Sequence, residues 1–320
     1  MTISEFELIK KYFLSKFYSP TLVAIGVGDD AAVINTSPNE QLVVSVDTLN
    51  LGVHFSEDMP AFDVGYKALA VNLSDMAAMG ARPKWFTLAL SLPEVDETWI
   101  EQFSQGMLSL AQQYDVALVG GDTTRGPLSI TIQIAGTVPV EKALTRAGAK
   151  PGDAIYVTGT LGDAAAALAI IKNELCLDME NRECLEKRLY RPTPRVETGL
   201  ALSSIASACI DISDGLAADL GHVLEASGVG AEINREDLPL STGLQQLEKK
   251  QQITFALHGG DDYELCFTAP ASASTKIEAL GDRLDCAITC IGKIIPEPGL
   301  YQVANGKRVA VAAKGFDHFN

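Results

Sequence analysis

Aspartates beside glycine or a small polar residue recur along this chain of 320 residues, where strands or helices are expected to end. An aspartate carries its charge on a short arm, and glycine lets the backbone take positive φ and lets a bulky group approach closely. The six motifs are GDD (28–30), SVDT (45–48), NLSD (72–75), GGDTT (120–124), DISDG (211–215) and GGDDYE (259–264). One such motif would indicate an ordinary turn. Six in one chain favour a shared chemical role.

Metal binding is the chemistry that these side chains fit. Mg²⁺ prefers hard oxygen ligands and is usually held by one or two carboxylates, with waters and substrate phosphates completing the octahedron. Converging short acids would hold several Mg²⁺ ions against a polyphosphate. In the GDD motif we expect Asp30 to bind a cation directly, and Asp29 to fix the loop or bind through water.

Other phosphate-binding motifs fit the sequence poorly. GVGDDA (26–31) matches the loose pattern G-x-G-x-x-A, but no long helix follows, and two carboxylates would face the pyrophosphate. The chain has neither a P-loop nor a protein-kinase catalytic loop. The turn TGTLGD (158–163) lacks lysine, so packing and helix capping are favoured there. RPTPR (191–195) is predicted to be a rigid turn with solvated arginines.

Charge and composition exclude several classes of partner. The formal net charge is −16 and the pI about 4.6, which argues against binding to nucleic acid or an anionic membrane surface. The six cysteines form no C-x-x-C pair, and we expect buried, reduced thiols in a cytoplasmic protein. The most apolar segment, 154–171, contains Gly159, Gly162 and Asp163, so it indicates strand, turn and helix rather than a membrane span.

The elements that must position the acids follow from periodicity and capping signals. Helices are expected over 4–17, 63–79 with Asp63 as N-cap, and 97–114 capped near Asp96, then after Gly162, over 180–189 and 196–208, and after DISDG. Strands are expected over 31–34, 42–47, 85–92, 116–119, 128–138 and 154–158, and as an apolar run leading into GGDDYE.

The segment TRAGAKPGD (145–153) is the best candidate for a domain boundary, because it contains Gly and Pro residues and a new strand is expected after it. We therefore divide the chain into domains 1–148 and 149–320. Helices alternate with strands that are often sequence neighbours, which predicts two α+β domains rather than one doubly wound sheet. GGDTT in the first half and GGDDYE in the second share the sequence Gly-Gly-Asp, a weak similarity between the two halves.

Taken together, these motifs resemble the thiamine-monophosphate kinase family, within the aminoimidazole-ribonucleotide-synthetase superfamily. The resemblance is collinear over nearly the whole chain. It rests on GDDAAV, SVDTLNLGVHF, YKALAVNLSDMAAMGARP, GGDTTRG, LTRAGAKPGD, IDISDGL, GGDDYELCF and the terminal GFDHF. One departure is Val46, where the family often has threonine; a metal contact through its backbone carbonyl would survive the change.

The resemblance implies a fold and a reaction. It implies a homodimer whose N-terminal α/β domains form an intersubunit β-barrel, a C-terminal α+β domain, and an ATP–metal site in the cleft between domains. ATP would phosphorylate thiamine monophosphate to thiamine diphosphate, with several Mg²⁺ ions and K⁺ as a further candidate ion.

Site residues are carried over motif by motif. The residues implied as magnesium ligands are Asp30, Ser45, Asp47, Asp75, Asp122, Asp211 and Asp214. Those implied to contact ATP are Gly121, Asp122, Arg146 and Ser213. Those implied to line the thiamine phosphate site are His54, Glu264 and Phe316, the last two by charge pairing and cation–π contact with the thiazolium.

The expected mechanism needs no covalent nucleophile. A phosphate monoester has a second pKa of about 6, so the acceptor oxygen is largely ionised at neutral pH and needs no general base. Repulsion between two polyanions and their alignment are the obstacles, which metal ions and a rigid site would overcome. Three alternatives stay open: a sibling ATP-dependent synthetase, a magnesium-dependent nucleotide-binding protein without turnover, and a phosphohydrolase.

Overall fold

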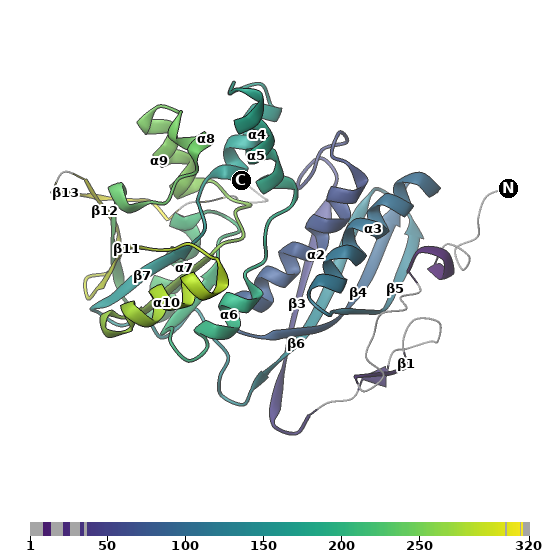
Figure 1. Ribbon diagram of the computed structural model, residues 1–320, viewed down its shortest axis with the longest axis horizontal. Coiled ribbons are helices and arrows are strands. Elements are labelled where there is room, and N and C mark those ends of the chain that lie inside the picture. Colours follow the sequence, from purple (N-terminus) through teal and green to yellow (C-terminus); the bar gives the residue numbers. More distant parts are fainter. Residues whose placement is uncertain are drawn as a thin grey trace. The chain divides into compact units, whose positions relative to one another are not determined.

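The computed structural model describes residues 9–13, 22–25, 33–34, 37–304, 306–313 and 315. The chain divides into two compact units. Unit 1 holds the described residues up to Met76 together with Ala81–Glu141, and unit 2 holds Ala77–Gly80 with the described residues from Lys142 onward. Each unit combines helices with a sheet (Figure 1), which confirms the predicted α+β class. The segment TRAGAKPGD, which contains the predicted domain boundary, belongs entirely to unit 2.

Unit 1 is built on a four-stranded sheet of order β3-β6-β4-β5. Its strands are β3 (Glu40–Asn50), β4 (Arg82–Leu92), β5 (Ala117–Arg125) and β6 (Ser129–Pro139). Only the β4–β5 pair is parallel. Helices α2 (Ala61–Ala78) and α3 (Glu97–Gln113) lie over one face of this sheet (Figure 1). The short elements η1 (Ile9–Phe13), β1 (Val23–Ile25) and β2 (Val33–Ile34) precede it.

Two glycines allow α2 and α3 to cross closely. A Cβ at Gly65 would lie 2.0 Å from the Phe103 carbonyl oxygen, and one at Gly106 would lie 1.9 Å from the Phe62 carbonyl oxygen. Only glycine therefore fits at either crossing point. The Asp96 carboxylate accepts hydrogen bonds from two N–H groups of the first turn of α3, which confirms the predicted cap.

The other face of the unit 1 sheet carries exposed apolar side chains on its edge strand. Leu42, Val44 and Val46 of β3 are 54%, 53% and 59% exposed. Side chains alternate along a strand, so Ser45 and Asp47 project from the opposite face, the one covered by helices. Three large apolar residues in one exposed row are typical of a surface that another chain covers.

Unit 2 is built on a seven-stranded sheet of order β13-β12-β9-β11-β7-β10-β8. Its strands are β7 (Asp153–Thr158), β8 (Ala208–Asp211), β9 (Gly230–Asn234), β10 (Leu265–Pro270), β11 (Ile288–Ile295), β12 (Gly299–Ala304) and β13 (Lys307–Ala310). All neighbouring pairs are antiparallel except β9 and β12. Strands β10 and β8 are adjacent, so the GGDDYE and DISDG motifs flank one strand pair.

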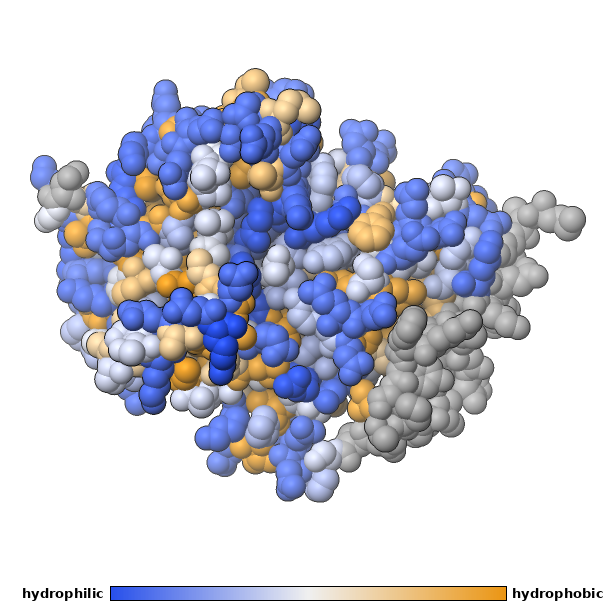
Figure 2. Space-filling model, in the orientation of Figure 1, coloured by the Kyte–Doolittle hydropathy of each residue, from blue (hydrophilic) through white to orange (hydrophobic). Residues whose placement is uncertain are grey.

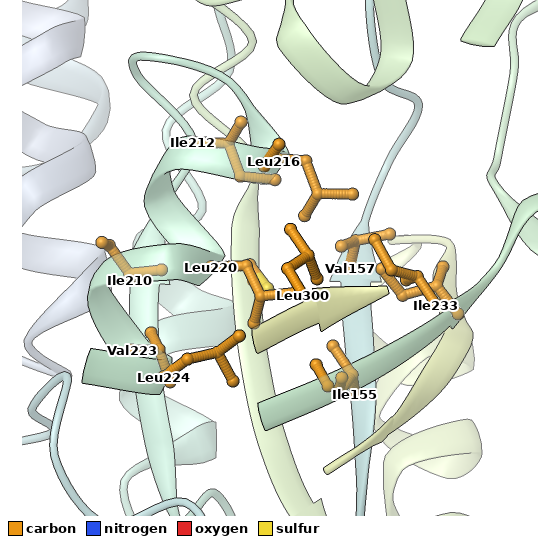
Figure 3. Packing of buried hydrophobic residues seen from close by; sticks show 14 of the residues in the cluster. Ile155, Val157, Ile210, Ile212, Leu216, Leu220, Val223, Leu224, Ile233 and Leu300 are labelled. Atoms are coloured by element: carbon orange, nitrogen blue, oxygen red, sulfur yellow. The ribbon is translucent and has the colours of Figure 1, made fainter. Parts of the chain in front are cut away.

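Seven α-helices of the described chain accompany this sheet. They are α4 (Asp163–Ile171), α5 (Met179–Tyr190), α6 (Val196–Leu202), α7 (Leu216–Ser227), α8 (Thr242–Gln245), α9 (Lys249–His258) and α10 (Ser274–Leu284), with the 3₁₀ turns η2 (Arg235–Asp237) and η3 (Ala271–Ala273). Figure 3 shows the main core of unit 2, where Leu216 and Leu220 of α7 pack towards Ile155 and Val157 of β7 and Leu300 of β12.

Three local predictions are wrong. The apolar run before GGDDYE is helix α9, not a strand: a capping box formed by Glu248 and Gln251 starts the helix, and its buried residues recur at helical spacing. Helix α6 ends at Leu202 rather than near 208. Helix α2 begins at Ala61, so Asp63 lies in its first turn and is not the N-cap.

The predicted helix 4–17 falls largely outside the described residues, apart from Ile9–Phe13. Across the described parts of the chain, no helix is long and apolar enough to cross a membrane. On the face shown in Figure 2, hydrophilic residues predominate and apolar residues form small patches.

Candidate functional site

In unit 1, two predicted magnesium ligands touch each other. The Ser45 hydroxyl of β3 donates a hydrogen bond to the Asp75 carboxylate of α2. Asp47 lies two residues further along the strand, on the same face as Ser45, and all three are partly exposed. The strand and the helix thus bring Ser45, Asp47 and Asp75 to one side of the sheet. The side chain of Val46 points the other way.

Asp122 lies on β5, the far edge of the same sheet. The row of paired residues runs from Asp47 through Ile132 and Leu88 to Gly121, so two strands separate the two aspartates. At about 4.8 Å per strand, the two edges are about 14 Å apart. Since Mg²⁺ binds its ligands at about 2.1 Å, this spacing favours more than one ion. Asp122 is exposed.

Gly121 lets β5 approach β4. A Cβ at this position would lie 2.0 Å from the carbonyl oxygen of Leu88. The strand register also shifts between Phe86 and Thr87, so β5 bulges just before the motif. The glycine pair of GGDTT therefore places Asp122 on a locally distorted edge strand, where its carboxylate stays accessible.

In unit 2, the DISDG loop joins β8 to α7. Asp211 is buried at the end of the strand, and Ser213 and Asp214 are partly exposed in the loop. Asp219 closes the loop: its carboxylate accepts hydrogen bonds from the N–H groups of Asp214 (3.1 Å) and Gly215 (3.0 Å). Burial, and then the charges of Asp211 and Asp214, raise the pKa of Asp219 to about 8. Asp219 is not among the residues predicted from the sequence, although a carboxylate in the first turn of a helix is a known capping signal.

The GGDDYE motif forms a ladder with the DISDG loop. Ile212 N–H donates to the Glu264 carbonyl, Tyr263 N–H to the Ile212 carbonyl and Asp261 N–H to the Ser213 carbonyl, each at 2.8 Å. A Cβ at Gly260 would lie 2.4 Å from the Ser213 carbonyl oxygen. The two acidic motifs of unit 2 therefore form one supporting structure.

The Glu264 side chain is fully buried among basic and hydroxyl groups. It accepts hydrogen bonds from Thr158 Oγ1 (2.6 Å), Arg188 Nη2 (2.5 Å), Arg195 Nε (2.6 Å) and Arg195 Nη2 (2.7 Å). Burial raises its pKa, but the hydrogen bond and charge of Arg195 and the charge of Arg188 outweigh this effect, so the net pKa is lowered. The prediction of a solvated Arg195 is wrong, because its side chain is 17% exposed and paired.

Of the two roles predicted for TGTLGD, packing is confirmed, because Leu161 and Asp163 are buried, but helix capping is wrong, because Gly162, the N-cap of α4, makes no side-chain capping hydrogen bond. Thr160 and Ser241 hydroxyls each donate to the Asp163 carboxylate at 2.5 Å. Gly162 N–H donates to an oxygen of the buried Asp262 carboxyl group at 2.7 Å. The polar groups of this turn are therefore engaged within unit 2.

Arg146 lies in a loop that Ser227 fixes. Ser227, the last residue of α7, accepts hydrogen bonds from the N–H groups of Gly148 and Ala149 at 3.1 Å and donates to the Arg146 carbonyl at 3.2 Å. A Cβ at Gly148 would lie 2.3 Å from the Ser207 carbonyl oxygen. No motif in the sequence indicated Ser227.

Of the predicted substrate residues, His54 and Glu264 are described. His54 lies in the turn after β3, where its Nδ1 accepts a hydrogen bond from Asn50 N–H at 3.0 Å, so the proton of the neutral ring lies on Nε2. Phe316, Asp29 and Asp30 lie outside the described residues. Gly315 lies against the DISDG loop, because a Cβ there would be 2.3 Å from the Asp214 carbonyl oxygen.

The donor set suits magnesium in chemical type. Aspartate and serine oxygens are hard ligands, and the buried Asn72 Oδ1, one turn before Asp75, has no hydrogen-bond partner. Among residues that the structure describes, no three or more His, Cys, Asp or Glu side chains cluster as a metal centre. The described residues thus offer hard oxygen donors that are spread over several strands, a helix and a loop rather than gathered in one group.

The cysteines differ from the prediction. All six are free; Cys209, Cys266 and Cys286 are buried as expected, but Cys176, Cys184 and Cys290 are exposed.

Comparisons with known proteins cover the whole chain. Residues 28–138 match the family described as AIR synthase related protein, N-terminal domain, and residues 150–304 match its C-terminal domain. The chain is 49% identical over 322 residues to thiamine-monophosphate kinase of Escherichia coli (strain K12), covering 100% of this chain and 99% of that protein.

Two solved structures share the fold. Thiamine-monophosphate kinase from Stenotrophomonas maltophilia K279a is 47% identical, with a TM-score of 0.87 over 97% of this chain and 99% of that one. AaThiL complexed with AMPPCP and TMP is 34% identical, with a TM-score of 0.78 over 100% of this chain and 99% of that one.

Proposed function

Because the chain belongs to the thiamine-monophosphate kinase family of AIR synthase related proteins, we propose that it transfers the γ-phosphoryl group of ATP to thiamine monophosphate. The products are thiamine diphosphate and ADP. The observation that carries the proposal is the 49% identity over the full length to a thiamine-monophosphate kinase. A relative that binds AMPPCP, an ATP analogue, together with TMP supports the same pair of substrates.

The transfer is direct and in line. A phosphate oxygen of thiamine monophosphate attacks Pγ, the bond from Pγ to the β–γ bridging oxygen breaks, and ADP leaves with that electron pair. The acceptor is already an anion at neutral pH, so no side chain has to remove a proton. Alignment of the two phosphates is the task left to the protein, and the constrained glycines of the GGDTT and GGDDYE motifs fit that task.

Residues of both units carry the proposed contacts. The proposed magnesium ligands are Asp30, Ser45, Asp47, Asp75, Asp122, Asp211 and Asp214. When bound, the ions would neutralise charge between the two polyanions. Gly121, Asp122, Arg146 and Ser213 would contact ATP, and His54 and Phe316 would line the thiamine phosphate site, which Glu264 would support from its buried position rather than contact directly. K⁺ as a further ion and a cytoplasmic location are likewise proposals.

The direct test is to incubate the purified protein with Mg-ATP and thiamine monophosphate and to separate the products. Thiamine diphosphate and ADP should appear in equal amounts, and omitting magnesium should abolish both. ADP with inorganic phosphate would indicate a phosphohydrolase, and nucleotide binding without products would indicate a binding protein. Recovery of radiolabelled phosphoprotein after one turnover would contradict direct transfer.

We also propose a homodimer in which the exposed face of the unit 1 sheet joins the same face of a second copy in a β-barrel. The row of Leu42, Val44 and Val46 supports this arrangement, because burying it removes apolar area from water. Light scattering should give twice the chain mass for the wild type and half of that for Val44→Lys. The control is Val309→Lys on β13, where a valine is 52% exposed in unit 2; an equal effect of both changes would contradict the proposed surface.

A further inference from the structure

The carboxylate of Glu264 is saturated by groups of its own unit. Oε1 accepts from Arg188 and Arg195, and Oε2 accepts from Arg195 and Thr158. A carboxylate has about four lone-pair positions, so all are occupied. The side chain is 0% exposed. A substrate cation could reach these oxygens only by displacing an arginine.

The cluster around Glu264 is close to electrically neutral. Arg188 also lies 3.8 Å from the Asp163 carboxylate, measured from Nε to Oδ2. Two guanidinium groups therefore face two carboxylates, Glu264 and Asp163. A neutral, buried cluster suits support of the fold better than capture of an anion, because no net positive charge is left for a phosphate.

The backbone of Glu264 connects this cluster to the DISDG loop. Its carbonyl accepts from Ile212 N–H, and the preceding residues bond to Ile212 and Ser213 at 2.8 Å. Asp261 and Tyr263 have positive φ angles of 67° and 50°, a backbone conformation that residues other than glycine rarely adopt. Such a conformation persists only where its surroundings enforce it, and here the arginine pair anchors its end.

We propose that Arg188 and Arg195 are positioning residues for the kinase reaction, acting through Glu264 on the loop that carries Ser213 and Asp214. Arg195, at the start of α6, binds the Glu264 carboxylate through a bidentate pair of hydrogen bonds, and Arg188, near the end of α5, adds a second cation. Loss of either arginine loosens the ladder between GGDDYE and DISDG. This inference rests on the proposed function for its kinetic effects, but not for the structural ones.

The kinetic test compares Glu264→Gln, Arg195→Gln and their double variant in the full-length protein. Each single change should lower kcat by about tenfold to a hundredfold through misplacement of the loop. Each should raise the Mg²⁺ concentration for half-maximal activity, leaving KM for thiamine monophosphate within about threefold. The double variant should be no worse than the worse single one, because both changes break one unit.

Arg191→Gln is the matched control, since it removes an exposed arginine from the same RPTPR segment. It should leave all kinetic constants near those of the wild type. A Glu264→Gln variant that raises only KM for thiamine monophosphate, beside a normal Arg195→Gln variant, would overturn the proposal and favour direct contact of Glu264 with substrate.

A second measurement needs no turnover. Arg195→Lys keeps the positive charge but cannot form the bidentate hydrogen bonds of the guanidinium group. In hydrogen-exchange mass spectrometry, segments 211–215 and 259–264 should exchange faster in this variant than in Arg191→Gln. Faster exchange confined to 188–200 would refute the link to the loop. If the wild type forms no thiamine diphosphate, the proposed function fails, while this arm still decides whether the arginines hold the loop.

Discussion

The two Gly-Gly-Asp motifs show that similar sequences can hold acidic residues in contrasting environments, one exposed and one buried. In both, the second glycine lies against a neighbouring carbonyl: Gly121 against Leu88 and Gly260 against Ser213. Beyond the glycines they diverge. Asp122 is exposed on an edge strand, whereas Glu264, at the end of GGDDYE, is fully buried and takes four hydrogen bonds. In this pair, accessibility rather than motif separates the acid that we propose to bind a metal from the one that stabilises the fold.

The largest effect on activity is expected at Asp122. Asp122→Asn removes a charge that we propose to bind Mg²⁺, so kcat/KM should fall by about a hundredfold or more. Because the side chain is exposed, the thermal unfolding midpoint should stay within about 2 °C of the wild-type value. Steady-state kinetics and calorimetry measure the two quantities. A large loss of stability with unchanged activity would reverse the contrast drawn with Glu264.

A large effect on stability is expected at Gly159, beside Glu264. A Cβ there would lie 2.1 Å from Glu264 Oε1, and φ is +59°. Gly159→Ala should lower the free energy of unfolding by about 3–5 kcal/mol, because it displaces a buried ion pair. Gly152→Ala is the control: φ is also positive, but nothing lies within 4 Å, so strain alone should cost about 1–2 kcal/mol. Chemical denaturation compares the variants, and equal losses would show that the ion pair tolerates the methyl group.

A pH-dependent effect is expected at Asp262. Burial, reinforced by the Asp163 and Glu264 charges, raises its pKa well above the ordinary 3.8. The folded state then favours the neutral acid, so unfolding releases a proton, and rising pH above 3.8 lowers stability. The slope for this one group is at most about 1.4 kcal/mol per pH unit. Asp262→Asn, which keeps an acceptor for Gly162 N–H, should therefore gain stability relative to wild type between pH 4 and 7 by about 1–3 kcal/mol. A constant difference across this range would contradict a neutral Asp262.

The smallest effect is expected at Ser227, which positions Arg146 only through the backbone. Ser227→Ala should raise KM for ATP by about threefold to tenfold, since it removes hydrogen bonds worth about 1 kcal/mol each, with kcat and KM for thiamine monophosphate little changed. Ser227→Thr should restore the wild-type value. An equal rise in both KM values would place Ser227 outside the nucleotide contact.

The sequence by itself predicted the α+β class, most element positions, the cap of α3 at Asp96 and the family, because periodicity, turn residues and motif order are properties of neighbouring residues. It could not predict that Arg195 is buried against Glu264, that Ser227 supports the loop of Arg146, or that two strands separate Asp47 from Asp122. Those relations join residues 60 to 110 positions apart or depend on strand order, as in Arg195 with Glu264 (69 apart) and Ser227 with Arg146 (81 apart). Only the tertiary structure decides which charges lose their water, because burial depends on what the rest of the chain packs against them.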